Sequence, residues 1–162
     1  MIANSLTKSN QRTLASDIFF SGIGLHKGKK ANVTITSDVP NSGITFIRSD
    51  LNENNIIKAL WTNVSSSTLS TTIMNGNNIS VSTIEHLMSA LSGMHVDNAR
   101  IYIDGPEVPI MDGSSKPFVE LIENAKIKEQ SYKRKIIKVL KKVETRREDS
   151  FARLLPNKQF SI

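Results

Sequence analysis

Apolar and polar residues alternate along several short stretches of the chain, a pattern typical of β-strands with one buried face. In "KANVTIT" the apolar residues Ala31, Val33 and Ile35 occupy every second position. A glycine-rich segment joins this stretch to the preceding "QRTLASDIFF", which predicts a strand, a turn and a second strand. The stretches "NSGITFIRSDL" and "DNARIYIDG" predict further strands, and Asn75-Gly76, between two β-prone runs, predicts a hairpin.

Two other stretches have the spacing of three and four residues that is typical of an amphipathic helix. The apolar positions of the first helix, in "STIEHLMSALSG", are Ile84, Leu87, Met88 and Leu91. Those of the second, in "SSKPFVELIENAKI", are Phe118, Leu121, Ile122 and Ala125, and Pro117 suits its first turn. Because strands and helices do not alternate regularly, we expect an α+β fold, a two-layer sandwich of a mainly antiparallel sheet with two helices.

Composition divides the chain into three parts. Residues 1–127 hold the predicted sheet and helices and are expected to form an N-terminal α+β domain. Residues 128–135 are polar and basic and are interpreted as a linker. The stretch "IIKVLKKVETRREDSFARLLP" predicts two strands around a charged turn, so residues 136–162 are interpreted as the beginning of a second, truncated α+β domain.

The net charge of +6 is unevenly distributed. Residues 1–130 carry 11 Lys and Arg against 12 Asp and Glu, whereas residues 131–162 carry 10 against 3. A basic end of this kind is typical of a nucleic-acid-binding or phosphate-binding arm, or of a solvated strand face. Its only aromatic residues are Tyr132, Phe151 and Phe160, too few for a stacking platform, so we expect no nucleic-acid partner.

The chain has no cysteine, which excludes disulfides and thiolate metal sites. It also has no apolar run approaching the ~18 residues that cross a membrane. The first residues, "MIANSLTKSNQRTL", are polar and do not resemble a secretory signal. From these features we expect a cytoplasmic protein without a transmembrane segment.

Glu85 and His86 stand side by side at the start of the first predicted helix, and the residues leave two interpretations open. In the first, Ser82 and Glu85 form a capping box and His86 is a surface or hydrogen-bonding residue. In the second, the pair is half of a metal site, because His86 lies opposite the apolar stripe on a small, polar side of the helix. The other two histidines, His26 and His95, are interpreted as polar turn residues.

Three separated blocks carry a resemblance to a known family: "SGIGLHKGKKANVTI", "STIEHLMSALSGMHVDNARI" and "GPEVPIMDGSSKPFVELI". In order and spacing they resemble the N-terminal half of UDP-3-O-acyl-N-acetylglucosamine deacetylase, the zinc enzyme of lipid A biosynthesis in Gram-negative bacteria, whose product enters lipopolysaccharide. The resemblance extends over residues 11–162 in one register. It implies a hydrolase that removes the N-acetyl group of a UDP-linked acylated glucosamine and releases acetate.

The resemblance also implies roles for individual residues. His86 matches a Zn²⁺ ligand, and Glu85 matches the general base toward the attacking water, which zinc activates. The stretch "TLSTTIM" resembles the family segment that lines the acyl-chain and acetamide region, so Leu69, Ser70 and Thr71 are expected to bind substrate. Ser70 departs from the family, many members of which carry Cys there. The alternative for residues 68–72 is a plain β-strand.

The motif "MDGSS" resembles a family loop close to the site, which implies that Asp112 and Gly113 lie near it. The alternative is a turn in which the Asp side chain caps its own backbone.

Other residues that the family uses have no counterpart in this sequence. The resemblance implies a further zinc-binding His and Asp and a second catalytic His from a later segment, and no His follows His95 here. We therefore expect this chain to be inactive alone, either as a fragment or as half of a split enzyme that needs a C-terminal partner polypeptide. The alternatives are a non-catalytic remnant and a sugar-nucleotide-binding half.

Overall fold

The computed structural model describes residues 10–157, which belong to two units. One unit comprises residues 11–132, and the other comprises Asn10 with residues 133–157. The larger unit contains both helices and most strands, and it confirms the α+β fold with a mainly antiparallel arrangement. Within residues 10–157, neither helix is long and apolar enough to cross a membrane.

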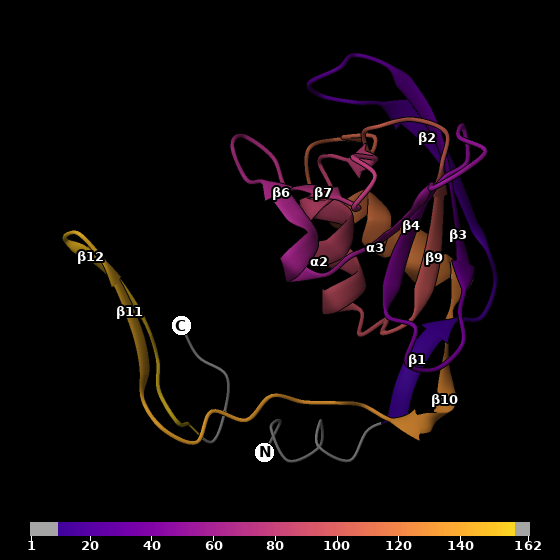
Figure 1. Ribbon diagram of the computed structural model, residues 1–162. Coiled ribbons are helices and arrows are strands. Elements are labelled where there is room, and N and C mark those ends of the chain that lie inside the picture. The colour runs from indigo at the N-terminus through magenta and orange to yellow at the C-terminus, as the bar shows by residue number, and fades with distance from the viewer. Residues whose placement is uncertain (1–9, 158–162) are drawn as a thin grey trace. The chain divides into compact units, whose positions relative to one another are not determined.

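A five-stranded sheet forms the main layer of the larger unit (Figure 1). In spatial order its strands are β2 (Ile18–Ile23), β3 (Lys30–Ser37), β9 (Ala99–Ile103), β4 (Ile44–Arg48) and β5 (Ile56–Lys58). Neighbouring strands are antiparallel except β4 and β9, which run parallel. A parallel pair requires a long connection. Here the connection runs from residue 49 to residue 98 and includes the segment that contains Glu85 and His86.

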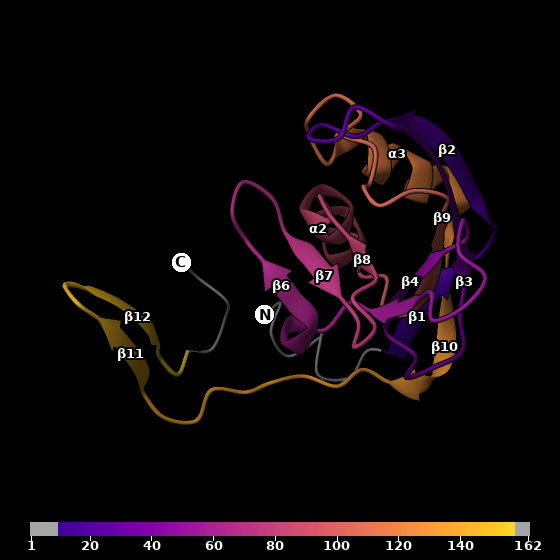
Figure 2. The same ribbon diagram turned by 45° about the horizontal axis from the view of Figure 1, so that its top comes forward.

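The two helices, α2 (Glu85–Gly93) and α3 (Lys116–Ala125), lie side by side on one face of this sheet, as Figure 1 and the turned view in Figure 2 agree. The alternation predicted in β3 is confirmed, since Ala31, Val33 and Ile35 are at most 2% exposed. The helices bury the predicted stripes against the same layer: Ile84, Leu87, Leu91, Phe118, Ile122 and Ala125 are buried, and Met88 and Leu121 are partly buried. The sandwich is therefore held together by one continuous apolar core.

A smaller sheet, β6–β7–β8, lies beside α2 (Figure 2). It follows a short 3₁₀ helix, η1 (Trp61–Asn63), and comprises β6 (Val64–Ser66), β7 (Thr72–Met74) and β8 (Ser80–Val81). The hairpin predicted at Asn75-Gly76 is confirmed, because β7 and β8 pair antiparallel on either side of it. The Asn75 side chain organises the loop by accepting hydrogen bonds from the backbone N–H groups of Asn77 and Ile79.

Strands β1 (Asn10–Leu14) and β10 (Ile127–Lys133) pair with each other at the end of the larger unit. A buried amide, Asn98, ties them to the sheet: its Nδ2 donates to Gln11 Oε1 at 2.8 Å and to Gln130 Oε1 at 2.7 Å. Strand β10 includes most of residues 128–135, the segment that the sequence predicts as a linker.

The second unit contains one hairpin, β11 (Val143–Arg147) with β12 (Ser150–Leu154), as the sequence predicts. Glu144 accepts hydrogen bonds from Arg146 at 2.8 Å and Arg153 at 2.6 Å, and both guanidinium groups lie over the Phe151 ring. Part of the excess positive charge of this region is thus paired with one carboxylate. The assignment of residues 136–162 to the start of a second domain stays a prediction, and residues 158–162 lie outside the described part of the chain.

Candidate active site at the start of helix α2

Helix α2 begins at Glu85, four residues after strand β8 ends at Val81. Ser82 still belongs to the strand layer, because it forms a parallel bridge with Glu107 and its Oγ donates to Pro106 O at 3.2 Å. The N-cap residue is Ile84, and no side chain caps the helix. The predicted Ser82–Glu85 capping box is therefore wrong: Ser82 is engaged with the 106–108 segment, and Glu85 is the first helical residue instead of the third.

The Glu85 carboxylate is held by a neighbouring segment of chain instead of by its own helix. Glu85 Oε2 accepts a hydrogen bond from the backbone N–H of Thr71 at 2.9 Å, and the N–H of Ile84 donates to Thr71 O at 3.4 Å. The structure thus brings the proposed base directly against the predicted substrate-binding segment. The two parts are 14 residues apart in sequence, and only the β7–β8 hairpin returns the chain to this point.

His86 follows Glu85 in the first turn of α2 and is half-buried. The residues that α2 packs into the core are Leu87, Ala90 and Leu91, so His86 is not part of the buried stripe. Within residues 10–157 its imidazole has no hydrogen bond or ion pair that would occupy its ring nitrogens. An imidazole next to a carboxylate suits the donor chemistry of Zn²⁺, so these residues fit as one ligand and one neighbouring base.

A complete metal site is not formed by this part of the chain alone. Within residues 10–157, no three His, Cys, Asp or Glu side chains are grouped so that they could hold an ion. His26 lies exposed in the β2–β3 turn and His95 lies exposed just beyond the end of α2, where the sequence places them. A full set of protein ligands around His86 would therefore need at least one residue from outside the described part of the chain.

The segment 69–71 is a bend and not a strand. Leu69 has a left-handed backbone, with φ of 62°, and its side chain is 86% exposed, whereas Ser70 and Thr71 are half-buried. Strand β7 begins only at Thr72, so the alternative of a plain strand over residues 68–72 is wrong for most of its length. The bend is what lets the Thr71 N–H point at Glu85. Substrate binding by Leu69, Ser70 and Thr71 stays a prediction.

Asp112 and Gly113 form the turn that the alternative interpretation predicts. Asp112 Oδ1 accepts from the N–H of Ser114 at 2.9 Å and from its hydroxyl at 2.8 Å, and Gly113 has φ of +83°. The Ser114 N–H and hydroxyl hold the pKa of Asp112 below its ordinary value. No hydrogen bond joins Asp112 to Glu85 or His86 in the described structure, and a place for Asp112 and Gly113 in the site stays a prediction.

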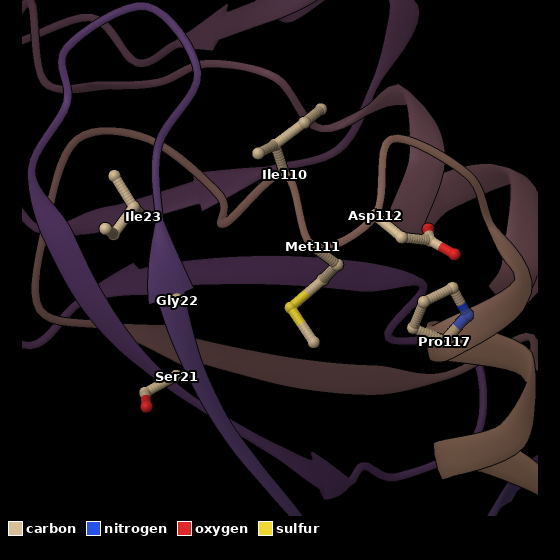
Figure 3. Close-up of a pocket in the computed structure, with 7 residues that line it drawn as sticks. All are labelled: Ser21, Gly22, Ile23, Ile110, Met111, Asp112 and Pro117. Atoms are coloured by element: carbon tan, nitrogen blue, oxygen red, sulfur yellow. The ribbon is translucent and has the colours of Figure 1, made fainter.

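Asp112 does line a shallow open hollow between strand β2 and the segment that leads into α3 (Figure 3). The hollow is lined by Ser21, Gly22, Ile23, Ile110, Met111, Asp112 and Pro117. Figure 3 shows the Met111 side chain reaching toward β2 at Gly22. A Cβ atom on Gly22 would lie 2.9 Å from Pro109 Cβ and 3.5 Å from Met111 Sδ, so a glycine is needed for this close approach.

Glu107 is a buried acid near the site that the sequence reasoning did not single out. It is 3% exposed, its Oε1 accepts from His26 N and from Thr83 Oγ1, both at 2.9 Å, and its Oε2 accepts from Lys27 N at 2.8 Å. Burial acts to raise the pKa of Glu107, but these three donors outweigh burial and hold the pKa below its ordinary value. The available signal was an acidic residue in the otherwise apolar run "GPEVPIM".

Comparisons with known proteins show the family to which this chain is similar. The family model described as LpxC, UDP-3-O-acyl N-acetylglycosamine deacetylase, matches residues 11–162. Proteins named UDP-3-O-acyl-N-acetylglucosamine deacetylase are 45% identical in Idiomarina loihiensis, 43% in Methylococcus capsulatus and 41% in Shewanella halifaxensis. Each match covers 152 residues, which is 94% of this chain and 50% of the relative.

The chain thus spans about half the length of the curated relatives it matches. The matched residues, 11–162, include both helices and all of the five-stranded sheet. On this ground the chain belongs to the UDP-3-O-acyl N-acetylglycosamine deacetylase family.

Proposed function

We propose that this chain supplies the N-terminal half of a UDP-3-O-acyl-N-acetylglucosamine deacetylase, which hydrolyses the N-acetyl group of its UDP-linked substrate and releases acetate. The observation that supports this most directly is the hydrogen bond between Glu85 and the Thr71 N–H. It sets a carboxylate with a fixed orientation against the 69–71 bend, beside an imidazole with no competing partner in the described chain.

Glu85 is suited to act as general base because its two oxygens have different surroundings. Oε2 is held by Thr71, while Oε1 has no protein partner within residues 10–157 and can accept a proton from water. The resulting hydroxide adds to the acetamide carbonyl. The proton that Glu85 took from the water then passes to the nitrogen, the C–N bond breaks, and the amine and acetate are released. The Thr71 N–H keeps the carboxylate in one orientation during this proton transfer.

His86 is proposed to hold one corner of a Zn²⁺ site. Bound zinc would polarise the acetamide carbonyl and lower the pKa of the attacking water. Because adjacent residues of a helix point ~100° apart, His86 can bind the ion while Glu85 faces the water. The remaining ligands are proposed to come from a C-terminal half of the enzyme, which the relatives' greater length supports. A place in lipid A biosynthesis and a cytoplasmic location stay predictions from the sequence.

The test is a chimera in which residues 1–162 replace the matching N-terminal half of the Idiomarina loihiensis relative. We expect the chimera to bind zinc and to release acetate from UDP-3-O-acyl-N-acetylglucosamine. Glu85→Gln should keep zinc and lose at least about 10²-fold in turnover, the usual contribution of a positioned base. His86→Ala should lose zinc, measured by metal analysis after gel filtration, because one ligand of a small set is removed.

Matched controls on the same chain separate chemistry from folding. Glu120→Gln replaces an exposed glutamate of α3, and His95→Ala replaces an exposed histidine beyond α2, so both should leave zinc content and turnover unchanged. A folded chimera whose Glu85→Gln variant turns over substrate as fast as its parent would contradict the proposal. A folded chimera that binds the sugar nucleotide without releasing acetate would favour the sugar-nucleotide-binding alternative.

A further inference from the structure

The buried carboxylate of Glu107 takes no part in the chemistry proposed above, yet it connects three segments that meet beside the site. It lies between β9 and α3 in sequence, and it reaches the β2–β3 turn through the N–H groups of His26 and Lys27. Through Oε1 it also accepts the hydroxyl of Thr83, at 2.9 Å. Thr83 lies two residues before Glu85 and three before His86.

Thr83 needs such a partner because of its backbone conformation. Its φ is +57°, a left-handed value that is unfavourable for a β-branched residue and persists only where surrounding contacts hold it. This left-handed residue is what turns the chain from the strand layer at Ser82 into α2. The Thr83 hydroxyl is buried with the rest of the residue, which is 2% exposed, so its hydrogen bond to Glu107 has no water substitute.

The first turn of α2 has no side-chain cap of its own. Its position is set from outside, by Thr71 on one side and by Thr83 with its Glu107 partner on the other. Backbone hydrogen bonds to the 106–108 segment also fix the residue before Thr83. Ser82 N donates to Pro106 O at 3.0 Å, and Val108 N donates to Ser82 O at 3.1 Å. Within the 106–108 segment, Glu107 is thus the residue whose side chain accepts a hydrogen bond from Thr83, which leads into α2.

From this geometry we propose that Glu107 is a positioning residue for Glu85 and His86, acting through the hydroxyl of Thr83. It does not touch substrate. It fixes the left-handed turn at Thr83, and so fixes the direction in which the first turn of α2 presents the carboxylate and the imidazole. The inference rests on the proposed function for the roles of Glu85 and His86, but its contacts are those of this chain alone.

The test uses Thr83→Val, which removes the hydroxyl but keeps the β-branched shape, and Thr83→Ser, which keeps the hydroxyl, in the 162-residue chain. Hydrogen exchange of backbone amides is followed by NMR, together with the ring signals of His86. In Thr83→Val we expect the amides of Thr71 and of the first turn of α2 to exchange roughly tenfold faster, the factor for one lost buried hydrogen bond. The His86 ring signals should shift in the same variant.

Thr83→Ser should restore the wild-type rates, and the amides of β3 and β9 should stay unchanged in both variants. Glu107→Gln also disturbs the contacts to the N–H groups of His26 and Lys27, so it should speed exchange more widely, with the largest increase still at Thr71 and the first turn of α2. In Thr83→Val, uniformly faster exchange across the whole unit would mean that the contact only adds stability, and it would overturn the proposal. Unchanged rates at Thr71 and unchanged His86 signals in Thr83→Val would overturn it as well.

The outcome is independent of the proposed deacetylase activity. Should the chimera described above prove inactive, the exchange experiment still reports whether Glu107 sets the position of α2. In an active chimera, Thr83→Val should lower kcat by about tenfold with little change in KM, since the orientation of the base is altered and the substrate contacts are kept.

Discussion

Glu85 and Glu107 are two acidic side chains near one helix end, and their surroundings suit different tasks. Both oxygens of Glu107 are engaged by donors from three other residues, and the side chain is buried. Glu85 is half-buried and has one oxygen engaged. A carboxylate with both oxygens engaged by buried donors holds structure, whereas one with an oxygen left over can take a proton.

The lowered pKa of Glu107 predicts how its contribution to stability depends on pH. A carboxyl group that binds its proton more weakly in the folded than in the unfolded chain stabilises the fold above its ordinary pKa, which is 4.5 here. That contribution is lost as the pH falls through the lower pKa of the folded state. We expect Glu107→Gln to lower the free energy of unfolding by about 2 kcal/mol near neutral pH, because a buried N–H donor loses its acceptor.

Urea unfolding of the two proteins at about pH 7 and about pH 3 checks this prediction, and the difference between them should shrink at the lower pH. Glu120→Gln is the matched control, since Glu120 is exposed and pairs with Lys116 only at 3.8 Å. Its effect should stay within about 0.5 kcal/mol at either pH. A difference for Glu107→Gln that does not change with pH would contradict the assignment of charge to this buried group.

Sequence reasoning at this scale singled out Glu85 and His86, and one of its two interpretations gave Glu85 the wrong local partner. The pattern S-x-x-E is local, and it cannot show that Ser82 is already paired with the 106–108 segment. Glu107 was missed for a related reason. Its partners lie 24 to 81 residues away in sequence, so no spacing rule connects them.

Among the elements, the β2–β3 hairpin is shaped by the segment between β9 and α3. A Cβ atom on Gly24 would lie 2.5 Å from Glu107 Oε2, so any side chain there would push against a carboxylate that three donors hold in place. Gly24→Ala should therefore lower the free energy of unfolding by about 1–3 kcal/mol, as overpacking of a buried site does.

Gly76→Ala provides the control for this substitution. Gly76 lies in the β7–β8 hairpin, nothing lies within 4 Å of a Cβ atom built there, and its φ is not positive. We expect a change within about 0.5 kcal/mol, measured by the same chemical unfolding. Equal effects of the two substitutions would mean that the Glu107 carboxylate moves aside without cost.

The helices and most strands could be predicted because their periods are local properties of the sequence. The stripe of α3 and the alternation of β3 follow directly from burial on one face. The 69–71 bend could not be predicted in this way, since "TLSTTIM" has strong strand propensity and only the left-handed Leu69 interrupts it. Tertiary contacts with α2 decide the conformation of this segment.

At the scale of the whole molecule, the buried apolar core of residues 10–157 lies between Leu14 and Ala125. No residue of β11 or β12 is buried. A chain ending at residue 134 should therefore unfold with a free energy within about 1 kcal/mol of the 162-residue protein, since residues 135–157 remove little apolar area from water.

Thermal and urea unfolding of the two lengths check this expectation. A shorter chain ending at residue 126 is the control, and it should be much less stable because it loses β10 and the Gln130 partner of the buried Asn98 amide. If ending at residue 134 proved as damaging as ending at 126, the hairpin would contribute to the core in a way that burial does not indicate.

Strands β4 and β9 are neighbours in the sheet, yet 50 residues separate the end of one from the start of the other along the chain. Glu85 and His86 therefore lie in a connecting segment, residues 49–98, whose two ends are fixed in neighbouring strands of the five-stranded sheet. The entropic cost of closing such a segment grows slowly, by roughly 0.6 kcal/mol for each doubling of its length. Insertions and deletions in the small β6–β8 sheet should therefore cost little folding free energy, while β4 and β9 keep their register in the five-stranded sheet.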